Sequence, residues 1–448
     1  MYRKEIEEFI EAHRQEMLDD ICTLCRINSE KMPYKEGMPY GQGAFTALAE
    51  ALSMAEAYGF SITNYDNYVG TADLNDKESQ LDILAHLDVV PAGEGWKETE
   101  PFEPVVKGDK LFGRGTADDK GPAVAALYAM RAVKELGVPL KKNARLILGT
   151  DEECGSSDIA HYYAIEKEAP MTFSPDGSYP VVNTEKGSLN GHFTASFAPS
   201  EALPNLVQGI DVEVMEKAAE AVTGETGIRF EFEVEEDFAT ITAIGEGAHA
   251  SKPEEGNNAL TGLLVLIQRL SFAACEQIST IGRLLELIPH GDTSGNALGI
   301  AMSDEISGDL TLAFSLLTIS DSELDGTFDS RCPICATKEN VLDVAKAKMA
   351  EKGFTLLNDS MRPPHHVDGD SEFISTLLRT YEEYTGRKGE CIAIGGGTYV
   401  HELKNGVAFG AAMPETDNRM HGADEFAVIE ELIVSAKMFA QVIIDLCS

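Results

Sequence analysis

Two apolar runs that end in histidine and carboxylate side chains constrain this sequence most. The first, Leu81-Asp-Ile-Leu-Ala-His-Leu-Asp88, places His86 and Asp88 at its end, and residues 145–149 lead into Asp151-Glu152-Glu153. Runs of this kind are typical of strands that are buried on both faces of a parallel sheet. Because such sheets bind ligands at the carboxyl ends of their strands, we expect these polar side chains to form a binding site.

The segments around these runs alternate between strand and helix patterns. Strand patterns lie at residues 68–74, 82–88, 145–149 and 171–174, and helical patterns at 3–27, 43–57, 122–136 and 156–166. Alternation of this length predicts an α/β domain with a mostly parallel central sheet.

The pattern changes from about residue 184. Residues 191–197, 229–244 and 310–318 alternate as half-exposed strands do, and helical patterns lie at 211–222 and 257–275. This predicts an inserted α+β domain with an antiparallel sheet at residues 184–363. The α/β pattern then resumes, with helices at 371–385 and 425–446 and a strand at 391–394. Residues 1–183 and 364–448 are therefore predicted to form one catalytic, metal-binding domain.

Composition excludes several classes of partner. The 448 residues include 36 Lys and Arg against 75 Asp and Glu, a net charge of −39, which argues against nucleic acid or an anionic membrane as partner. The start of the chain does not resemble a signal peptide, and the most apolar run, 259–267, is far shorter than the roughly 20 residues of a membrane span. We expect a cytoplasmic protein.

The eight cysteines include two Cys-x-x-Cys pairs that could form halves of a zinc site. These pairs, Cys22 with Cys25 and Cys332 with Cys335, are far apart in the sequence, and the first lies in a helical pattern. We expect free, reduced thiols instead.

Five positions beside strand ends or turns have side chains that suit a metal centre. They are His86, Asp118 or Asp119, Glu152 or Glu153, Asp176 and His421. Zinc and manganese bind histidine nitrogen and carboxylate oxygen. Two adjacent glutamates can have different roles, because one can bind a metal while the other acts as general base. Asp88 could orient the His86 imidazole. His365 and His366 are less suitable, since they follow two prolines at the expected domain junction.

The order of these motifs resembles that of a known family. The series runs His86-Leu-Asp-Val-Val-Pro91, Gly113-Arg-Gly-Thr-Ala-Asp-Asp-Lys-Gly121, Asp151-Glu-Glu-Cys-Gly-Ser156, Ser174-Pro-Asp176 with Glu185-Lys-Gly187, and His421. It closely resembles the dinuclear zinc peptidases that include aminoacylase, carnosinase and glutamate carboxypeptidase. The likeness is greatest to the bacterial dipeptidase V (PepV) branch, through Gly93-Glu-Gly-Trp96, Asp118-Asp-Lys-Gly-Pro122 and Gly395-Gly-Gly-Thr398. It covers nearly the whole chain.

This resemblance implies a centre with two divalent metal ions, zinc first, with manganese or cobalt as alternatives. The residues that it assigns to the metals are His86, Asp118 and Asp176 for one ion, and Glu153, His421 and the bridging Asp118 for the other. Glu152 would be the general base, and Asp88 would orient His86. The resemblance also implies a cis peptide bond between Asp118 and Asp119.

The resemblance makes the inserted domain a lid that closes over the substrate. His249, in Gly247-Ala-His-Ala-Ser-Lys-Pro253, would stabilise the tetrahedral oxyanion. Arg331 would bind the substrate carboxylate, aided by backbone amides of Gly396, Gly397 and Thr398.

The implied activity is hydrolysis of dipeptides by a water that lies between the two metals and is activated by Glu152. The PepV likeness further suggests a monomer, because an enlarged lid in that branch replaces a dimer partner. Two alternatives stay open: an N-acyl-amino-acid deacylase of the desuccinylase type, and an inactive relative that binds metal or peptide.

Overall fold

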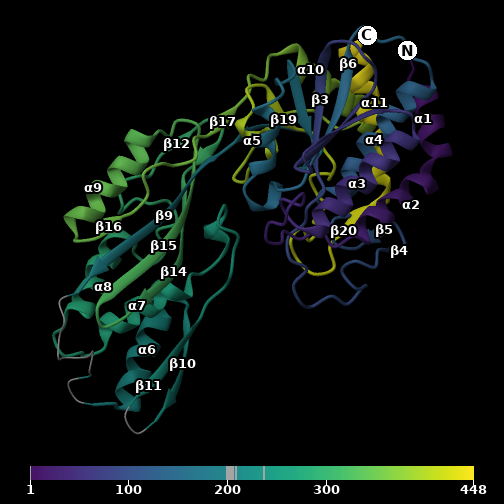
Figure 1. Ribbon diagram of the computed structural model, residues 1–448. Coiled ribbons are helices and arrows are strands. Elements are labelled where there is room, and N and C mark those ends of the chain that lie inside the picture. The colour runs from purple at the N-terminus through teal and green to yellow at the C-terminus, as the bar shows by residue number, and fades with distance from the viewer. Residues whose placement is uncertain (1, 198–205, 207–208, 236–237) are drawn as a thin grey trace. The chain divides into compact units, whose positions relative to one another are not determined.

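The computed structural model describes residues 2–197, 206, 209–235 and 238–448, and the chain divides into two compact units (Figure 1). Unit 1 comprises Met1–Thr184, His366–Ala393 and Gly397–Ser448, and unit 2 comprises Glu185–His365 and Ile394–Gly396. Among the described residues, no helix has the length and apolar character needed to cross a membrane.

Unit 1 is built on a mixed sheet with the order β1-β2-β6-β3-β7-β19-β8, which β17 and β18 join at β8. The strands are β1 (Ser61–Tyr65), β2 (Val69–Asp73), β3 (Ser79–His86), β6 (Asn143–Gly149), β7 (Met171–Ser174), β8 (Val181–Glu185), β17 (His365–His366), β18 (Cys391–Ile394) and β19 (Gly406–Ala408). The four neighbours β6, β3, β7 and β19 are parallel, whereas β1 with β2, β2 with β6, and β19 with β8 are antiparallel. The mostly parallel sheet expected from the sequence is therefore found only in the centre.

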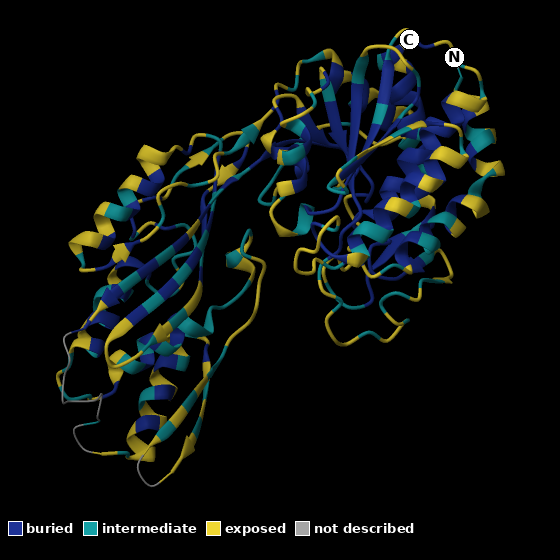
Figure 2. Cartoon of the chain, in the orientation of Figure 1, coloured by how far each residue is buried: buried dark blue, intermediate teal, exposed yellow. Residues whose placement is uncertain are grey.

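Helices cover both faces of this sheet. Leu81, Ile83 and Ala85 of β3 face a large core formed with helices from both ends of the chain. These helices are α1 (Arg3–Ala12), α2 (Arg14–Cys25), α3 (Gln42–Ala57), α4 (Lys120–Glu135), α10 (Glu372–Thr385) and α11 (Ile429–Cys447). Leu84 points to the opposite face and packs with α5 (Ser157–Tyr163) and the 3₁₀ turn η4 (Tyr399–Glu402). The central strands are consequently almost wholly buried (Figure 2).

Two helical patterns differ from expectation. The helix expected at 3–27 is two helices that meet at His13, whose ring stacks on Phe9 at a centroid distance of 4.1 Å. The segment expected as a helix from residue 425 begins instead with β20 (Phe426–Val428). This strand pairs with β5 (Lys110–Phe112), which pairs with β4 (Val105–Lys107).

Unit 2 contains an antiparallel sheet in the order β14-β15-β9-β16. Its strands are β9 (Gly187–Ser196), β14 (Thr311–Ile319), β15 (Glu323–Cys332) and β16 (Thr355–Leu356). One face of the sheet packs on α8 (Glu276–Leu287) and on α9 (Asp343–Glu351) with the preceding π-helical turn η3 (Lys338–Leu342).

A second core in unit 2 lies under a β-hairpin. Strands β10 (Arg229–Val234) and β11 (Ala239–Ile244) form this hairpin, and they pack with α6 (Val212–Thr226) and α7 (Ala259–Arg269). The helix expected at 257–275 thus ends at Arg269. The short pair β12 (Ser303–Asp304) and β13 (Gly308–Asp309) and the turns η1 (Glu152–Cys154) and η2 (Pro253–Glu255) complete the described elements.

All eight cysteines are free thiols, and the two Cys-x-x-Cys pairs lie in different units.

Candidate metal centre

His86 is the last residue of β3, and its imidazole is fully buried. The alternation of the strand turns it away from the large core, toward the face where the Tyr399 ring meets it edge-on at 6.1 Å. Its Nε2 lies 2.9 Å from Asp118 Oδ1 and 3.7 Å from Asp176 Oδ2. Its Nδ1 lies 3.1 Å from the backbone oxygen of Asp88, which fixes the ring orientation.

Asp118 lies in the loop between β5 and α4, and its carboxylate stands between two imidazoles. Oδ1 meets His86, and Oδ2 lies 2.9 Å from Nε2 of His421. Burial alone would raise the pKa of Asp118, but hydrogen bonds with His421 and His86 hold it below its ordinary value. At His86, burial alone would lower the pKa, but hydrogen bonds with Asp118 and Asp88 raise the pKa of the imidazole well above its ordinary value.

Asp176, which follows β7, and His421, which precedes β20, complete two groups of possible metal ligands. His86, Asp118 and Asp176 form one group, and Asp118, Glu153 and His421 form the other, with the ligand atoms of each group within 4.8 Å of one another. Glu153 Oε2 lies 3.3 Å from His421 Nε2, and hydrogen bonds with Asp118 and Glu153 raise the pKa of His421 to about 10. Asp118 is common to both groups, as a bridging carboxylate would be.

The donor set suits a divalent cation. Nitrogen from two imidazoles and oxygen from carboxylates are the ligands that zinc and manganese take. Burial, together with the charge of Asp118, raises the pKa of Asp176 to about 7. Crowded, buried carboxylates of this kind repel one another, and a bound cation relieves that repulsion.

Glu152 and Glu153 occupy η1, directly after β6, and the carboxylate of Asp88 fixes this turn. Its Oδ1 accepts the backbone N–H of Glu152 at 3.2 Å, and its Oδ2 accepts that of Glu153 at 3.1 Å. Asp88 Oδ1 also lies 3.4 Å from His86 Nδ1. Asp88 therefore makes more contacts than the sequence predicts, because it meets both His86 at the end of β3 and the turn that follows β6.

The environment distinguishes the two adjacent glutamates. Glu152 belongs to neither ligand group, and burial followed by the charges of Asp176 and Asp118 raises its pKa well above the ordinary value. Asp119 also stands outside both groups, and its Oδ2 accepts the backbone N–H of His86 at 3.0 Å. The peptide bond between Asp118 and Asp119 is cis, as the resemblance implied.

The residues expected to contact substrate are divided between the units. His249, Arg331 and Gly396 belong to unit 2, whereas Gly397 and Thr398 belong to unit 1. His249 is exposed, and its Nδ1 lies 2.7 Å from Ser251 Oγ.

Arg331, near the end of β15, is held in place by Asp329. Its Nε and Nη2 donate to the two Asp329 carboxylate oxygens at 2.6 and 3.1 Å, and Nη1 donates to the oxygen of Gly395 at 2.8 Å. A cavity of about 510 Å³ in unit 2 borders the segment that carries His249 and is also lined by Asn258 and His290, which sequence reasoning did not single out.

Histidines and carboxylates thus gather at the strand ends of a mixed sheet, in two groups that could hold divalent cations. The chain belongs to peptidase family M20/M25/M40, whose family model matches residues 83–445. It is thus a peptide hydrolase, and metallopeptidases of this family use divalent metal ions.

Two curated relatives match along almost the whole chain. The putative dipeptidase YtjP of Bacillus subtilis (strain 168) is 32% identical over 461 residues, which cover 97% of this chain and 97% of that protein. The Beta-Ala-Xaa dipeptidase of Lactobacillus delbrueckii subsp. lactis is 32% identical over 465 residues, 98% of each chain. Among solved structures, human carnosine dipeptidase 1 has the same fold, with a TM-score of 0.63 and 16% identity over 100% of this chain and 99% of that one.

Proposed function

We propose that this peptidase hydrolyses dipeptides at a centre of two divalent metal ions, zinc foremost, with unit 2 acting as a lid. The observation that carries the proposal is the position of the Asp118 carboxylate between His86 and His421. It creates two ligand groups that share one carboxylate, the arrangement that a pair of ions requires.

Cations bound to these residues would polarise the scissile carbonyl, lower the pKa of the attacking water and offset the repulsion among the carboxylates. Within the ligand groups, His86, Asp118 and Asp176 would bind one ion, and Asp118, Glu153 and His421 the other. Asp88 would hold both the His86 ring and the turn of Glu152 and Glu153 through the contacts described above.

Glu152 is proposed as the general base. Its carboxylate takes the proton of the attacking water and then delivers it to the leaving amine. Its burial among other carboxylates supports this role, because a raised pKa makes a carboxylate a stronger base.

Unit 2 would supply the groups that recognise the rest of the substrate. His249 donates a hydrogen bond to the oxyanion, and its exposure leaves its ring accessible. Arg331 binds the terminal carboxylate, since Asp329 fixes its planar guanidinium. Backbone amides of Gly396, Gly397 and Thr398 would assist. We further propose that the chain acts as a cytoplasmic monomer, as its resemblance to the PepV branch suggests.

A substrate panel tests this function. Metal-free protein is reloaded with zinc, manganese or cobalt and is offered dipeptides, including β-alanyl dipeptides, alongside tripeptides and N-acetyl and N-succinyl amino acids. We expect metal-dependent release of free amino acids from dipeptides. Preference for acylated amino acids would instead indicate a deacylase, and failure to hydrolyse any of these compounds with every metal would indicate a binding protein.

A further inference from the structure

A buried ion pair, Arg114 with Glu425, adjoins the candidate metal centre without belonging to either ligand group. Arg114 Nη1 donates to Glu425 Oε2 at 2.6 Å, and the two side chains are 1% and 0% exposed. Arg114 precedes Asp118 by four residues, and Glu425 follows His421 by four. The pair therefore connects the two loops that carry these possible ligands.

Glu425 organises the loop of Asp118 through its second carboxylate oxygen. Oε1 accepts the backbone N–H groups of Gly115, Ala117 and Asp118 at 3.0, 3.0 and 3.3 Å. The backbone oxygen of Glu425 accepts a further N–H, that of Gly113. A loop with no helix or strand of its own is thus held along its length by one residue of the other loop.

Arg114 acts in the opposite direction, on the loop of His421. Its Nη2 donates to the backbone oxygens of His421 and Pro91 at 3.3 Å and of Ala92 at 3.4 Å. The guanidinium also lies 5.5 Å from the centre of the Trp96 ring. The Arg114 guanidinium consequently holds both the segment that follows β3 and the loop that precedes β20.

The loop of His421 needs such support because its backbone is strained. His421 has a φ of 63° and Asp424 a φ of 57°, a conformation that residues with a side chain adopt only where their surroundings impose it. His86, in contrast, is positioned by the hydrogen bonds of a buried strand.

We infer that Arg114 and Glu425 are positioning residues that set the spacing between Asp118 and His421. This inference rests on the proposed two-metal centre. It predicts that loss of the pair lowers the metal affinity of the two ligand groups unequally. The group of Asp118, Glu153 and His421 depends on the pair more than the group anchored by His86 does. Groups that orient metal ligands typically change metal affinity by about 10–100-fold when they are removed.

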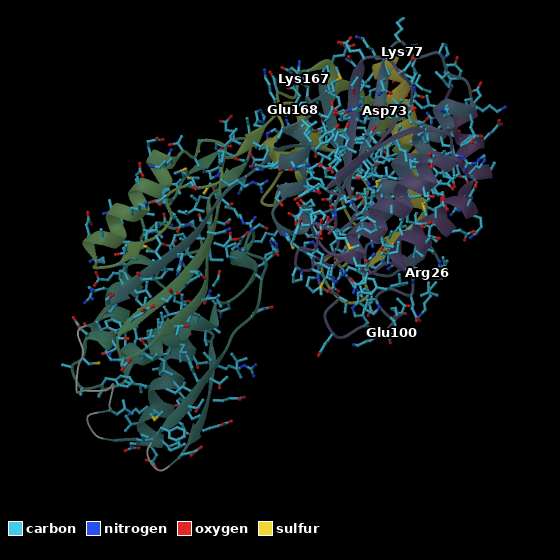
Figure 3. The ribbon with its side chains drawn as sticks, in the orientation of Figure 1. Arg26, Asp73, Lys77, Glu100, Lys167 and Glu168 are labelled. Carbon is cyan, nitrogen blue, oxygen red and sulfur yellow. The ribbon has the colours of Figure 1, made fainter. Side chains whose placement is uncertain are left out.

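Zinc titration of the metal-free protein tests this inference without any substrate. Glu425→Gln and Arg114→Met should weaken the binding of one of the two zinc ions by about 10–100-fold, with a smaller change for the other. Asp73→Asn is the matched control, because Asp73 (labelled in Figure 3) pairs with Arg145 at 2.9 Å. Arg145 lies near the start of β6, whereas the candidate metal centre lies beyond its end. Both zinc affinities should stay within about twofold in that control.

Glu425→Asp provides a second variant that keeps the charge next to Arg114. Its shorter side chain cannot reach Arg114 and three backbone N–H groups together, so we expect an intermediate zinc affinity and an altered absorption spectrum of the cobalt-loaded protein. Zinc affinities equal to those of the wild type in Glu425→Asp and in either other variant would overturn the inference, as would an equal loss in Asp73→Asn. Because zinc alone is the probe, the result does not depend on which peptide is the substrate.

Discussion

Two neighbouring carboxyl groups with different surroundings can perform different tasks. Glu153 lies 3.3 Å from His421 and belongs to a ligand group, whereas Glu152 stands apart from both groups in a half-buried position, where loss of solvation raises its pKa. The adjacent pair in the sequence predicts such a division, with one glutamate as a metal ligand and the other as general base. What the structure adds is the contact of Asp88 with both backbone N–H groups, which fixes the turn and so the directions of both side chains.

Replacement of Glu152 by alanine should separate metal binding from catalysis. We expect the turnover of dipeptides to fall by about 10²–10⁴-fold, because general-base catalysis contributes an effect of this size. Metal content, measured by elemental analysis, should stay close to that of the wild type. Glu153→Ala is the comparison, since it should lose both metal and activity. More than a tenth of the activity remaining in Glu152→Ala would exclude Glu152 as the base.

The residues that the sequence indicated are those proposed to act through their side chains. His86, Asp118 and His421 stand in recognisable motifs, and their side chains lie together. Arg114 and Glu425 were given no role, although Arg114 lies inside the motif Gly113–Gly121 and Glu425 follows His421 by four residues. Their contacts are largely with backbone groups of loops, and such contacts leave no periodic pattern in a sequence.

At the scale of elements, the buried strand β3 combines two functions. It forms part of the core of unit 1, and its end carries His86. It also contains a buried carboxyl, Asp82, whose Oδ2 accepts the backbone N–H of Ala169 at 3.3 Å. Burial raises the pKa of Asp82 to about 6, although the positive charge of Arg145 opposes the shift. Asp82 should therefore make the free energy of unfolding depend on pH.

The sign of that dependence follows from the raised pKa. Below about pH 4 the Asp82 carboxyl is neutral in both the folded and the unfolded chain, because the unfolded pKa of aspartate is about 3.9. As pH rises from about 4 to 6, only the unfolded chain ionises, so the folded state loses up to about 3 kcal/mol of relative stability. Asp82→Asn should lack this loss. Urea unfolding of metal-free wild type and variant at pH 4 and pH 7 measures the difference, and the same pH dependence in both proteins would refute it.

The elements that the sequence indicated correctly are those whose pattern is set by burial. The run at 145–149 is β6, and the helical pattern at 43–57 matches α3 within one residue. The break at His13 was missed because apolar periodicity continues on both sides of it. The strand β15 was missed as well, since its sequence, Glu-Leu-Asp-Gly-Thr-Phe-Asp-Ser-Arg-Cys, is rich in polar residues and contains a glycine. Pairing with β14 and β9 on its two sides overrides that weak preference.

At the scale of the whole molecule, the proposed tasks are divided between the two units. Unit 1 holds every residue of both ligand groups, and unit 2 holds His249 and Arg331. If this division is correct, substitutions in unit 2 should change catalysis without changing metal content. His249 and Arg331 should also differ from each other, because one would act on the oxyanion and the other on the ground-state substrate.

His249→Ala and Arg331→Met should therefore have distinct kinetics. Loss of an oxyanion donor typically lowers kcat by about 10²–10³-fold, so we expect His249→Ala to lower kcat with little change in KM. Loss of a hydrogen bond to a charged group costs about 1.5–3 kcal/mol, so Arg331→Met should raise KM by roughly tenfold or more. Steady-state kinetics on one dipeptide, with zinc content determined for each protein, would measure both effects.

Asp329→Asn is the control that separates substrate binding from a purely structural ion pair. Asp329 holds the Arg331 guanidinium by two hydrogen bonds, and its amide replacement removes the charge while leaving the arginine in place. If Arg331 binds the substrate carboxylate, Asp329→Asn should raise KM much less than Arg331→Met does. Equal losses in the two variants, with a matching fall in thermal stability, would show that the pair only supports the end of β15. In that case the substrate carboxylate would have to be bound by other groups.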